Sequence, residues 1–363
     1  MRRDIQNGRR PAGRRRQQGV ALIIALILVA LATILATKLS FDGWLEQRRT
    51  LGVLAAEQAL QFAMGAEALA ADVLGQTPTS QGQSVTLNQP WAQPTQPLPL
   101  TSPDDPEGEP IGTLQGALED MQGRFNLNNL AAPPPPLGGA ANPGSIANPV
   151  GAAGTQFDPQ PLAQFQRLLI LAGLEPKWAG IARDWITATD VPSSPDGAKD
   201  SIYTSQNPPY RTGEYPMMSA SELMNMPGFG AERYRKIAPY VTALPLQGGV
   251  PVKINICTAP ALVLESLAKN LSGEWSRSAD LLVTERKAGC FPTLSVFSTI
   301  VTAADPTVTA AALATYAAEQ SIYFRLTTRV NLGTTEFTLY SLLKAGGGGS
   351  GKVTPLLRTF GTP

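Results

Sequence analysis

The hydrophobic positions form one unbroken run near the amino terminus, and periodic patterns follow it. The run Val20–Ala36 is apolar at almost every position, and its length of about 17 residues is near the lower limit for a helix that crosses a bilayer. Between residues 40 and 74, apolar positions recur every three to four residues, which predicts an amphipathic helix. We therefore expect one continuous helix over residues 20–74, of which residues 20–38 cross a membrane.

Residues 75–130 are expected to form the first strands of a sheet. The first half of this segment is polar and rich in proline, with isolated strand-like pieces. In the second half, Phe125 and Leu127 alternate with Asn126 and Asn128, which predicts a half-buried strand that ends in a turn capped by side chains.

The remainder of the chain is divided between a linker, a helical region and a final pair of strands. Residues 131–160 are mainly Pro, Gly and Ala, which cannot bury enough apolar surface to become ordered, so we expect a flexible linker. Residues 161–320 show apolar faces at helical spacing. Residues 321–344 alternate between apolar and polar residues and predict a hairpin that returns to the sheet. The helical region is then an insertion within the sheet, and residues 345–363 form a flexible tail.

Composition limits the chemistry that this chain can perform. The sequence contains no histidine, which excludes histidine-based catalytic triads, histidine metal sites and histidine proton shuttles. Residues 346–352 (GGGGSGK) are similar to a phosphate-binding loop but lack the Ser or Thr that should follow the lysine. No nucleophile with an adjacent base is evident, so we expect no enzymatic activity. A membrane-anchored periplasmic hydrolase is the alternative.

Charge is distributed unevenly along the chain. Residues 1–19 contain seven arginines and one acidic residue, whereas the remaining residues contain 22 basic and 27 acidic ones. Arginines before the apolar run predict that the chain begins in the cytoplasm. A mildly acidic body is poorly suited to nucleic acid, because binding depends on neutralising phosphates. We therefore expect no nucleic-acid partner.

The amino terminus allows three interpretations. A secretory signal would be cleaved after the apolar run, near Ala36. An uncleaved signal anchor would keep the whole segment. In the third interpretation, cleavage occurs before the run, between Gly19 and Val20, and leaves the hydrophobic helix on the mature protein.

Several ordered motifs resemble one known family. The leader RRRQQG followed by VALIIAL is similar to type IV prepilins, and residues 120–128 resemble a D-x-x-G-R-F-N-L-N signature. The blocks DWI at 184–186, PPYR at 208–211 and VKINICTAP at 252–260 resemble the K-type minor pseudopilins of type II secretion. Ile24 stands where most pilins have Glu, and the K-type subunits also lack this acid.

The resemblance implies an α+β, type IV pilin-like fold. In this fold, a long amino-terminal membrane-spanning helix packs on an antiparallel sheet that carries a large all-α insertion domain. Residues 1–19 would be the prepilin leader. Within the insertion, residues 219–241 resemble a helix-hairpin-helix. This segment could either contact DNA through its basic residues or pack as helices within the protein. The acidic body favours packing.

The resemblance also implies a function, a location and partners. The protein would be a minor pseudopilin at the tip of the type II secretion pseudopilus, a structural component for export of folded proteins across the outer membrane. A prepilin peptidase would cleave the leader, with N-methylation of Val20. The chain would cross the inner membrane once, with a cytoplasmic amino terminus and a periplasmic body, and would contact I- and J-type minor pseudopilins and the major pseudopilin. The alternative is a minor pilin of a type IV pilus-like machine for adhesion or DNA uptake.

Two further expectations concern metal and cysteines. The family block near residue 190 carries calcium-binding carboxylates, which implies Asp190, Asp196 and Asp200 as ligands here. A solvated acidic loop is the alternative. Cys257 and Cys290 both fall in the presumed periplasmic body, where a disulfide can persist. Two buried thiols are the alternative to that disulfide.

Overall fold

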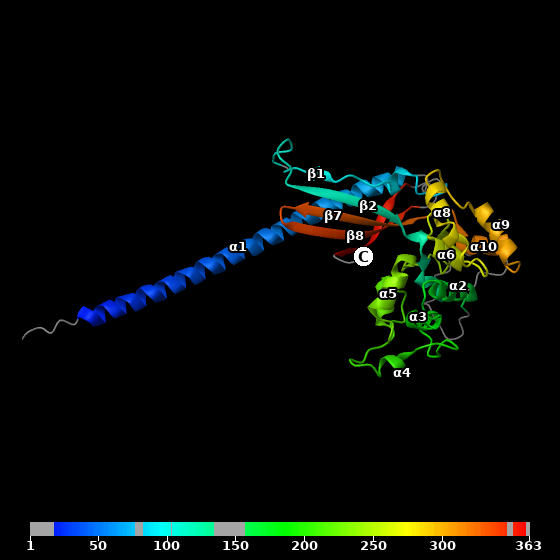
Figure 1. Cartoon of the computed structure of the whole chain (residues 1–363), viewed down its shortest axis with the longest axis horizontal. Coiled ribbons are helices and arrows are strands. Elements are labelled where there is room, and N and C mark those ends of the chain that lie inside the picture. The colour runs from blue at the N-terminus through cyan, green and yellow to red at the C-terminus, as the bar shows by residue number, and fades with distance from the viewer. Residues whose placement is uncertain (1–17, 77–82, 103, 134–156, 347–350, 361–363) are drawn as a thin grey trace, which may run out of the picture. The chain divides into compact units, whose positions relative to one another are not determined.

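The computed structural model describes residues 18–76, 83–102, 104–133, 157–346 and 351–360. The chain divides into two compact units, residues 1–58 and residues 59–363. Helix α1 (Gln18–Gln76) belongs to both (Figure 1). The predicted helix over residues 20–74 is therefore present and two residues longer at each end. Most of the predicted leader lies outside the described residues.

In the first unit, the described residues 18–58 belong to α1 and include its apolar run. The large aliphatic side chains of α1 from Val20 to Leu35 are each 53–66% exposed, so the described residues do not bury them. This helix is long and apolar enough to cross a membrane. The exposure is expected of a segment whose solvent is lipid, because no polar face balances the apolar one.

The second unit contains a five-stranded antiparallel sheet with strand order β1-β2-β7-β8-β9. The strands are β1 (Leu98–Leu100), β2 (Gly112–Asp120), β7 (Tyr323–Leu332), β8 (Thr335–Ala345) and β9 (Val353–Phe360). Strands β7 and β8 form the predicted hairpin, with Gly333 in the left-handed region (φ +55°) at the turn. Strand β2 pairs with β7 across more than 200 residues of sequence, so the sheet closes around an insertion.

The last part of α1 packs on this sheet through two clusters of small and aliphatic residues. One cluster joins Ala59 and Ala63 to Leu100, Val330, Leu332 and Leu339. The other joins Ala70 and Leu74 to Val85, Trp91, Phe324, Leu326 and Leu343. The alanines allow the helix to approach the sheet closely, and the apolar burial holds it there.

The prediction of a flexible tail over residues 345–363 was wrong for its described second half. Residues 353–360 form the edge strand β9, which pairs with β8 and shifts register between Leu342 and Leu343. Pro355 lies at this irregularity, where an edge strand tolerates a residue without an amide hydrogen. Arg358 also binds the buried carboxylate of Glu67 on α1, at 2.7 and 2.9 Å. The strand is thus fixed by a partner that is distant in sequence.

The insertion is mainly helical and lies at one end of the sheet (Figure 1). Its α-helices are α2 (Pro159–Leu171), α3 (Trp178–Ile186), α4 (Asp200–Tyr203), α5 (Gly230–Ile237), α6 (Ala261–Ser266), α7 (Glu274–Arg277), α8 (Ala279–Glu285), α9 (Leu294–Ala304) and α10 (Ala310–Tyr316). Its 3-10 helices are η3 (Met121–Gly123), η4 (Leu127–Ala131), η5 (Ala220–Asn225) and η6 (Ala238–Tyr240), and a further 3-10 helix, η2 (Pro90–Ala92), precedes β1. The block is not purely α-helical, because two-residue parallel pairs join β3 (Phe125–Asn126) to β4 (Val241–Thr242) and β5 (Ile254–Asn255) to β6 (Ala317–Ala318).

Two boundaries differ from the sequence expectation. The segment 121–131 is not a half-buried strand but a buried run of 3-10 turns around the short strand β3, because the helical block covers it on both faces. The predicted linker over residues 131–160 is too long at both ends, because Ala131 belongs to η4 and α2 begins at Pro159. Residues 134–156 of that linker lie outside the described residues.

Candidate functional site

The signature at residues 120–128 is the joint between the sheet and the helical block. Asp120 ends β2, and its fully buried carboxylate accepts four hydrogen bonds. The donors are Gln122 N (2.8 Å), Asn255 Nδ2 (2.9 Å), Thr258 Oγ1 (2.7 Å) and Ser321 Oγ (2.7 Å). Burial raises the pKa of Asp120, although these hydrogen bonds act to lower it. One side chain therefore connects the end of β2 to the segments that precede α6 and β7.

Three asparagines complete the joint, because each side-chain amide bonds a main-chain N–H and C=O as a neighbouring strand would. Each accepts from the amide and donates to the carbonyl of one distant residue, at 2.8–3.1 Å. The pairs are Asn126 with Leu244, Asn128 with Met217, and Asn129 with Val252. These bonds satisfy buried main-chain groups that would otherwise be costly to bury. The residues of this motif thus hold together segments that are distant in sequence.

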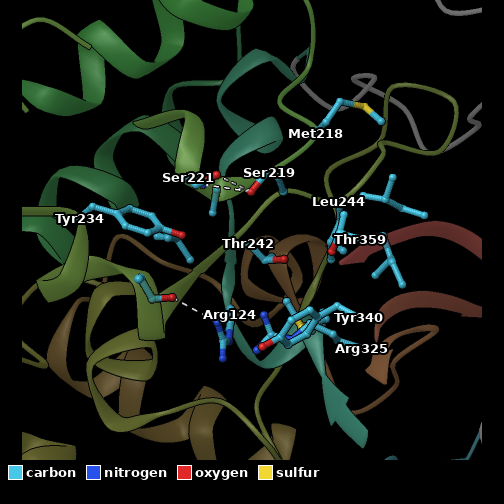
Figure 2. Close-up of a pocket in the computed structure, with 17 residues that line it drawn as sticks. Arg124, Met218, Ser219, Ser221, Tyr234, Thr242, Leu244, Arg325, Tyr340 and Thr359 are labelled. Atoms are coloured by element: carbon cyan, nitrogen blue, oxygen red, sulfur yellow. Dashed lines mark hydrogen bonds between the residues drawn. The ribbon is translucent and has the colours of Figure 1, made fainter. Parts of the chain in front are cut away.

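A cleft of about 240 Å³ separates strands of the sheet from η5 and α5, and Figure 2 shows its lining. Two lining residues, Arg124 and Arg325, form ion pairs with the carboxylate of Glu119 (2.7 Å for Arg325). Arg124 also donates to the carbonyl of Ala238 (3.1 Å). Two positive charges against one carboxylate leave the cleft with a basic bias. No local sequence pattern indicates this group, because Glu119 and Arg325 are 206 residues apart.

The acidic loop after α3 holds the carboxylates that the sequence indicated as metal ligands. The Asp200 carboxylate accepts from Thr212 N (3.0 Å) and Thr212 Oγ1 (2.8 Å). Those bonds lower the pKa of Asp200, the main-chain bond most, and Arg211 at 3.5 Å adds to the effect. The side chains of Asp190 and Asp196 are exposed. The structure does not gather the three aspartates into one ligand group among the residues it describes.

The centre of this loop is Lys199, which the sequence showed only as a basic residue in an acidic segment. Its side chain is buried, and Nζ donates to the carbonyls of Asp184 (2.7 Å) and Thr187 (2.5 Å). Asp184 is buried beside it and accepts from Ser193 N at 2.9 Å. Calcium needs six to eight oxygens at about 2.3–2.6 Å. The residues present do not fit that ion, because an ammonium group already occupies the carbonyl oxygens and the buried carboxylate is engaged.

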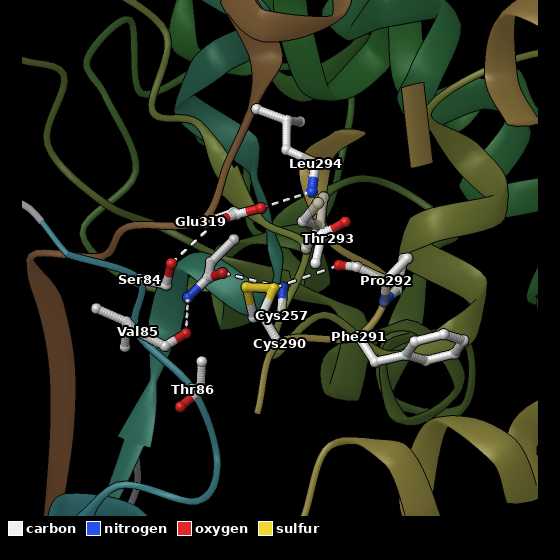
Figure 3. The surroundings of a disulfide bond; sticks show 12 residues. Ser84, Val85, Thr86, Cys257, Cys290, Phe291, Pro292, Thr293, Leu294 and Glu319 are labelled. Atoms are coloured by element: carbon white, nitrogen blue, oxygen red, sulfur yellow. Dashed lines mark hydrogen bonds between the residues drawn. A yellow bond between two sulfur atoms is a disulfide. The ribbon is translucent and has the colours of Figure 1, made fainter. Parts of the chain in front are cut away.

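Cys257 and Cys290 form a disulfide 33 residues apart in sequence (Figure 3). It links the segment after β5 to the loop before α9. Beside it, the Glu319 carboxylate accepts from Leu294 N (2.6 Å) and Ser84 Oγ (2.9 Å). These two cysteines and Glu319 are the one convergent group of possible metal ligands in the described part of the chain, but the disulfide leaves no thiolate to ligate a metal.

Two other predicted features have a clear position. Gly19 and Val20 lie in the first turn of α1, and both are exposed. In the segment 219–241, the first element is the 3-10 helix η5, and Phe229 of the hairpin packs edge-on against Trp178. Arg233 donates to the hairpin carbonyls of Gly228 (2.7 Å) and Phe229 (3.1 Å). Its guanidinium therefore stabilises the turn.

Comparison with known proteins identifies the family. The model of the family "Type II secretion system (T2SS), protein K" matches residues 123–246, which include most of the joint. A type II secretion system protein K from Aeromonas hydrophila is 34% identical over 235 residues, covering 64% of this chain and 65% of the relative. Another from Pseudomonas aeruginosa is 31% identical over 258 residues, covering 69% and 68%. The chain belongs to the type II secretion system protein K family.

Further comparisons extend over more of the chain. The protein K of Pectobacterium carotovorum is 28% identical over 339 residues, which cover 92% of this chain and 94% of the relative. A chain of the GspK-GspI-GspJ complex from enterotoxigenic Escherichia coli superposes with a TM-score of 0.67 at 24% identity, covering 87% of this chain and all of that one. The family resemblance drawn from the leader and the ordered motifs is confirmed, and so is the pilin-like fold with a helical insertion.

Proposed function

We propose that this member of the protein K family is a minor pseudopilin at the tip of a type II secretion pseudopilus. The observation that carries the proposal is the position of the helical block. Helix α1 enters the sheet beside Val330 and Leu332, whereas the block leaves the sheet at Asp120 and returns at Tyr323, the opposite end of β7. In a filament whose subunits enter from the membrane side, such a block would obstruct a further subunit above it.

The role is structural. Asp120 and the asparagines that follow it use their hydrogen bonds to hold the helical block on the sheet. A rigid joint suits a cap, because force along the filament must pass from the sheet to the block. The similar chain from enterotoxigenic Escherichia coli was crystallised as a GspK-GspI-GspJ complex, which supports I- and J-type minor pseudopilins as partners here. A role in export follows from the family name and agrees with this arrangement.

The membrane arrangement is part of the same proposal. Residues 20–38 of α1 would cross the inner membrane once, with the arginine-rich leader in the cytoplasm and residues from about 40 onward in the periplasm. A prepilin peptidase would cut between Gly19 and Val20. The oxidising periplasm would maintain the Cys257–Cys290 disulfide.

The experiment is co-expression of the full chain with the I- and J-type proteins and the major pseudopilin of the same genome. Detergent extracts purified on a tag at the carboxy terminus of this chain are weighed by native mass spectrometry. The proposal predicts one complex with a single copy of each minor subunit. The control omits the J-type protein and should abolish the full complex. Recovery of this chain with the major pseudopilin alone, in multiple copies, would refute a tip role.

A further inference from the structure

The buried ammonium group of Lys199 has an unusual environment for a lysine. Lysine is rarely buried without a partner, yet this residue is only 6% exposed. Its Nζ donates to the carbonyls of Asp184 and Thr187, and lies 3.4 Å from the Thr187 hydroxyl. Helix α3 ends at Ile186, so both carbonyls belong to its last turn and its C-cap. These are the oxygens that a helix leaves without partners and where its dipole is negative.

The charges around this ammonium are almost all negative. Burial lowers the pKa of Lys199, and the carboxylates of Asp184, Glu214, Asp200 and Asp190 each act against that shift by favouring the charged form. Two other cations lie near these acids: Arg211 is largely exposed and lies 3.5 Å from Asp200, and the half-buried Arg183 donates to Ser193 Oγ (3.0 Å) and interacts electrostatically with Asp184. Among these groups, Lys199 is the buried positive charge and Asp184 the buried carboxylate, whereas Asp200 is half-buried and Asp190 and Glu214 are exposed.

We infer that the Lys199 ammonium is a built-in cation that organises the loop between residues 184 and 214, so that the loop of this chain folds without calcium. The ammonium lies 2.5–2.7 Å from these two carbonyl oxygens, so a divalent ion that bound them would have to displace it. The two carboxylates beside the ammonium are also used, Asp184 by Ser193 and Asp200 by Thr212. The lysine is tethered to the chain, so chelators cannot remove it. This inference does not depend on the proposed position at the pseudopilus tip.

The test is thermal unfolding of the full chain in detergent, first with excess chelator and then with about 5 mM calcium chloride. Wild-type protein should give the same melting temperature in both. A calcium site filled at about 100 times its dissociation constant would instead raise the melting temperature by about 5 °C. Such a rise in the wild-type protein would overturn the inference, and this comparison needs no variant.

Two variants locate the effect. Lys199→Met keeps the length of the apolar stem but removes the charge, and should melt several degrees lower in both solutions. Lys199→Glu frees the carbonyls and adds a carboxylate, so it should melt low with chelator and recover with calcium. The matched control is Lys177→Met at the exposed start of α3, where the lysine makes a surface ion pair with Glu175 and lies 5.2 Å from the centre of the Trp178 ring. A Lys199→Met variant as stable as this control would overturn the inference.

Discussion

Replacing Asp120 with Ala should weaken the attachment of the helical block to the sheet. The change removes the acceptor of four hydrogen bonds in a fully buried position. Asn255 Nδ2 retains the carbonyl of Val85 (3.0 Å), and the Thr258 hydroxyl retains a 3.3 Å contact with the Asn255 carbonyl. Gln122 N and the Ser321 hydroxyl lose the Asp120 carboxylate as their hydrogen-bond acceptor.

The magnitude follows from those two donors. Each buried donor without an acceptor costs about 1–3 kcal/mol, and removing a buried charge returns part of that cost. We expect a net loss of about 3 kcal/mol in the free energy of unfolding. For a unit of this size, that loss lowers the melting temperature by about 6 °C. Asp120→Asn keeps the shape and one acceptor oxygen, so its loss should be smaller.

The assay is thermal unfolding of the full chain in detergent, followed by circular dichroism. Asp104→Ala is the matched control, because Asp104 is an exposed carboxylate of the same unit. Burial raises the pKa of Asp120, so the folded protein binds a proton at pH values where the unfolded chain has released it. Wild-type stability relative to Asp120→Asn should therefore increase as pH falls through that raised pKa. If Asp120→Ala has the same melting temperature as the control, Asp120 does not stabilise the attachment of the helical block.

Three further predictions address other parts of the chain. Hydrogen bonding from Arg358 lowers the pKa of Glu67, so this pair stabilises the fold above about pH 4.5. The contribution is lost as pH falls through the lowered pKa. Glu67→Gln should therefore remove the part of the melting-temperature change with pH that this pair causes. Replacing both disulfide cysteines with serine should cost about 3–4 kcal/mol by chain entropy, measured by chemical denaturation, and an unchanged midpoint would contradict a formed disulfide in the wild-type protein. Intact mass of the membrane-extracted chain should correspond to a start at Val20 with one added methyl group, whereas a start at Met1 or after Ala36 would exclude prepilin processing.

The parts of the fold that depend on local pattern were predictable from the sequence. The long helix and the β7–β8 hairpin follow from periods of 3.6 and 2, and both were found within two residues of their expected ends. Strand β9 escaped prediction because Pro355 interrupts its pattern and a glycine-rich segment precedes it. Its stability comes from β8 and from Glu67, about 290 residues away, which no local pattern reveals.

The same limit explains what was missed in the candidate sites. The motif around Asn126 and Asn128 was recognisable as a turn, but its partners Leu244 and Met217 lie about 90–120 residues further on. In the sequence, Lys199 is one basic residue among several aspartates. Its role depends on the direction of its side chain toward the end of α3, which only the fold specifies.

The most direct test of the proposed tip position is to locate this chain on assembled pseudopili. A gold-labelled tag at its carboxy terminus would be imaged by electron microscopy on pseudopili produced by over-expression of the major pseudopilin. A tip position predicts at most one label per filament, at one end. Labels distributed along the filament length would contradict it, because a subunit capped by the helical block could not occupy internal positions.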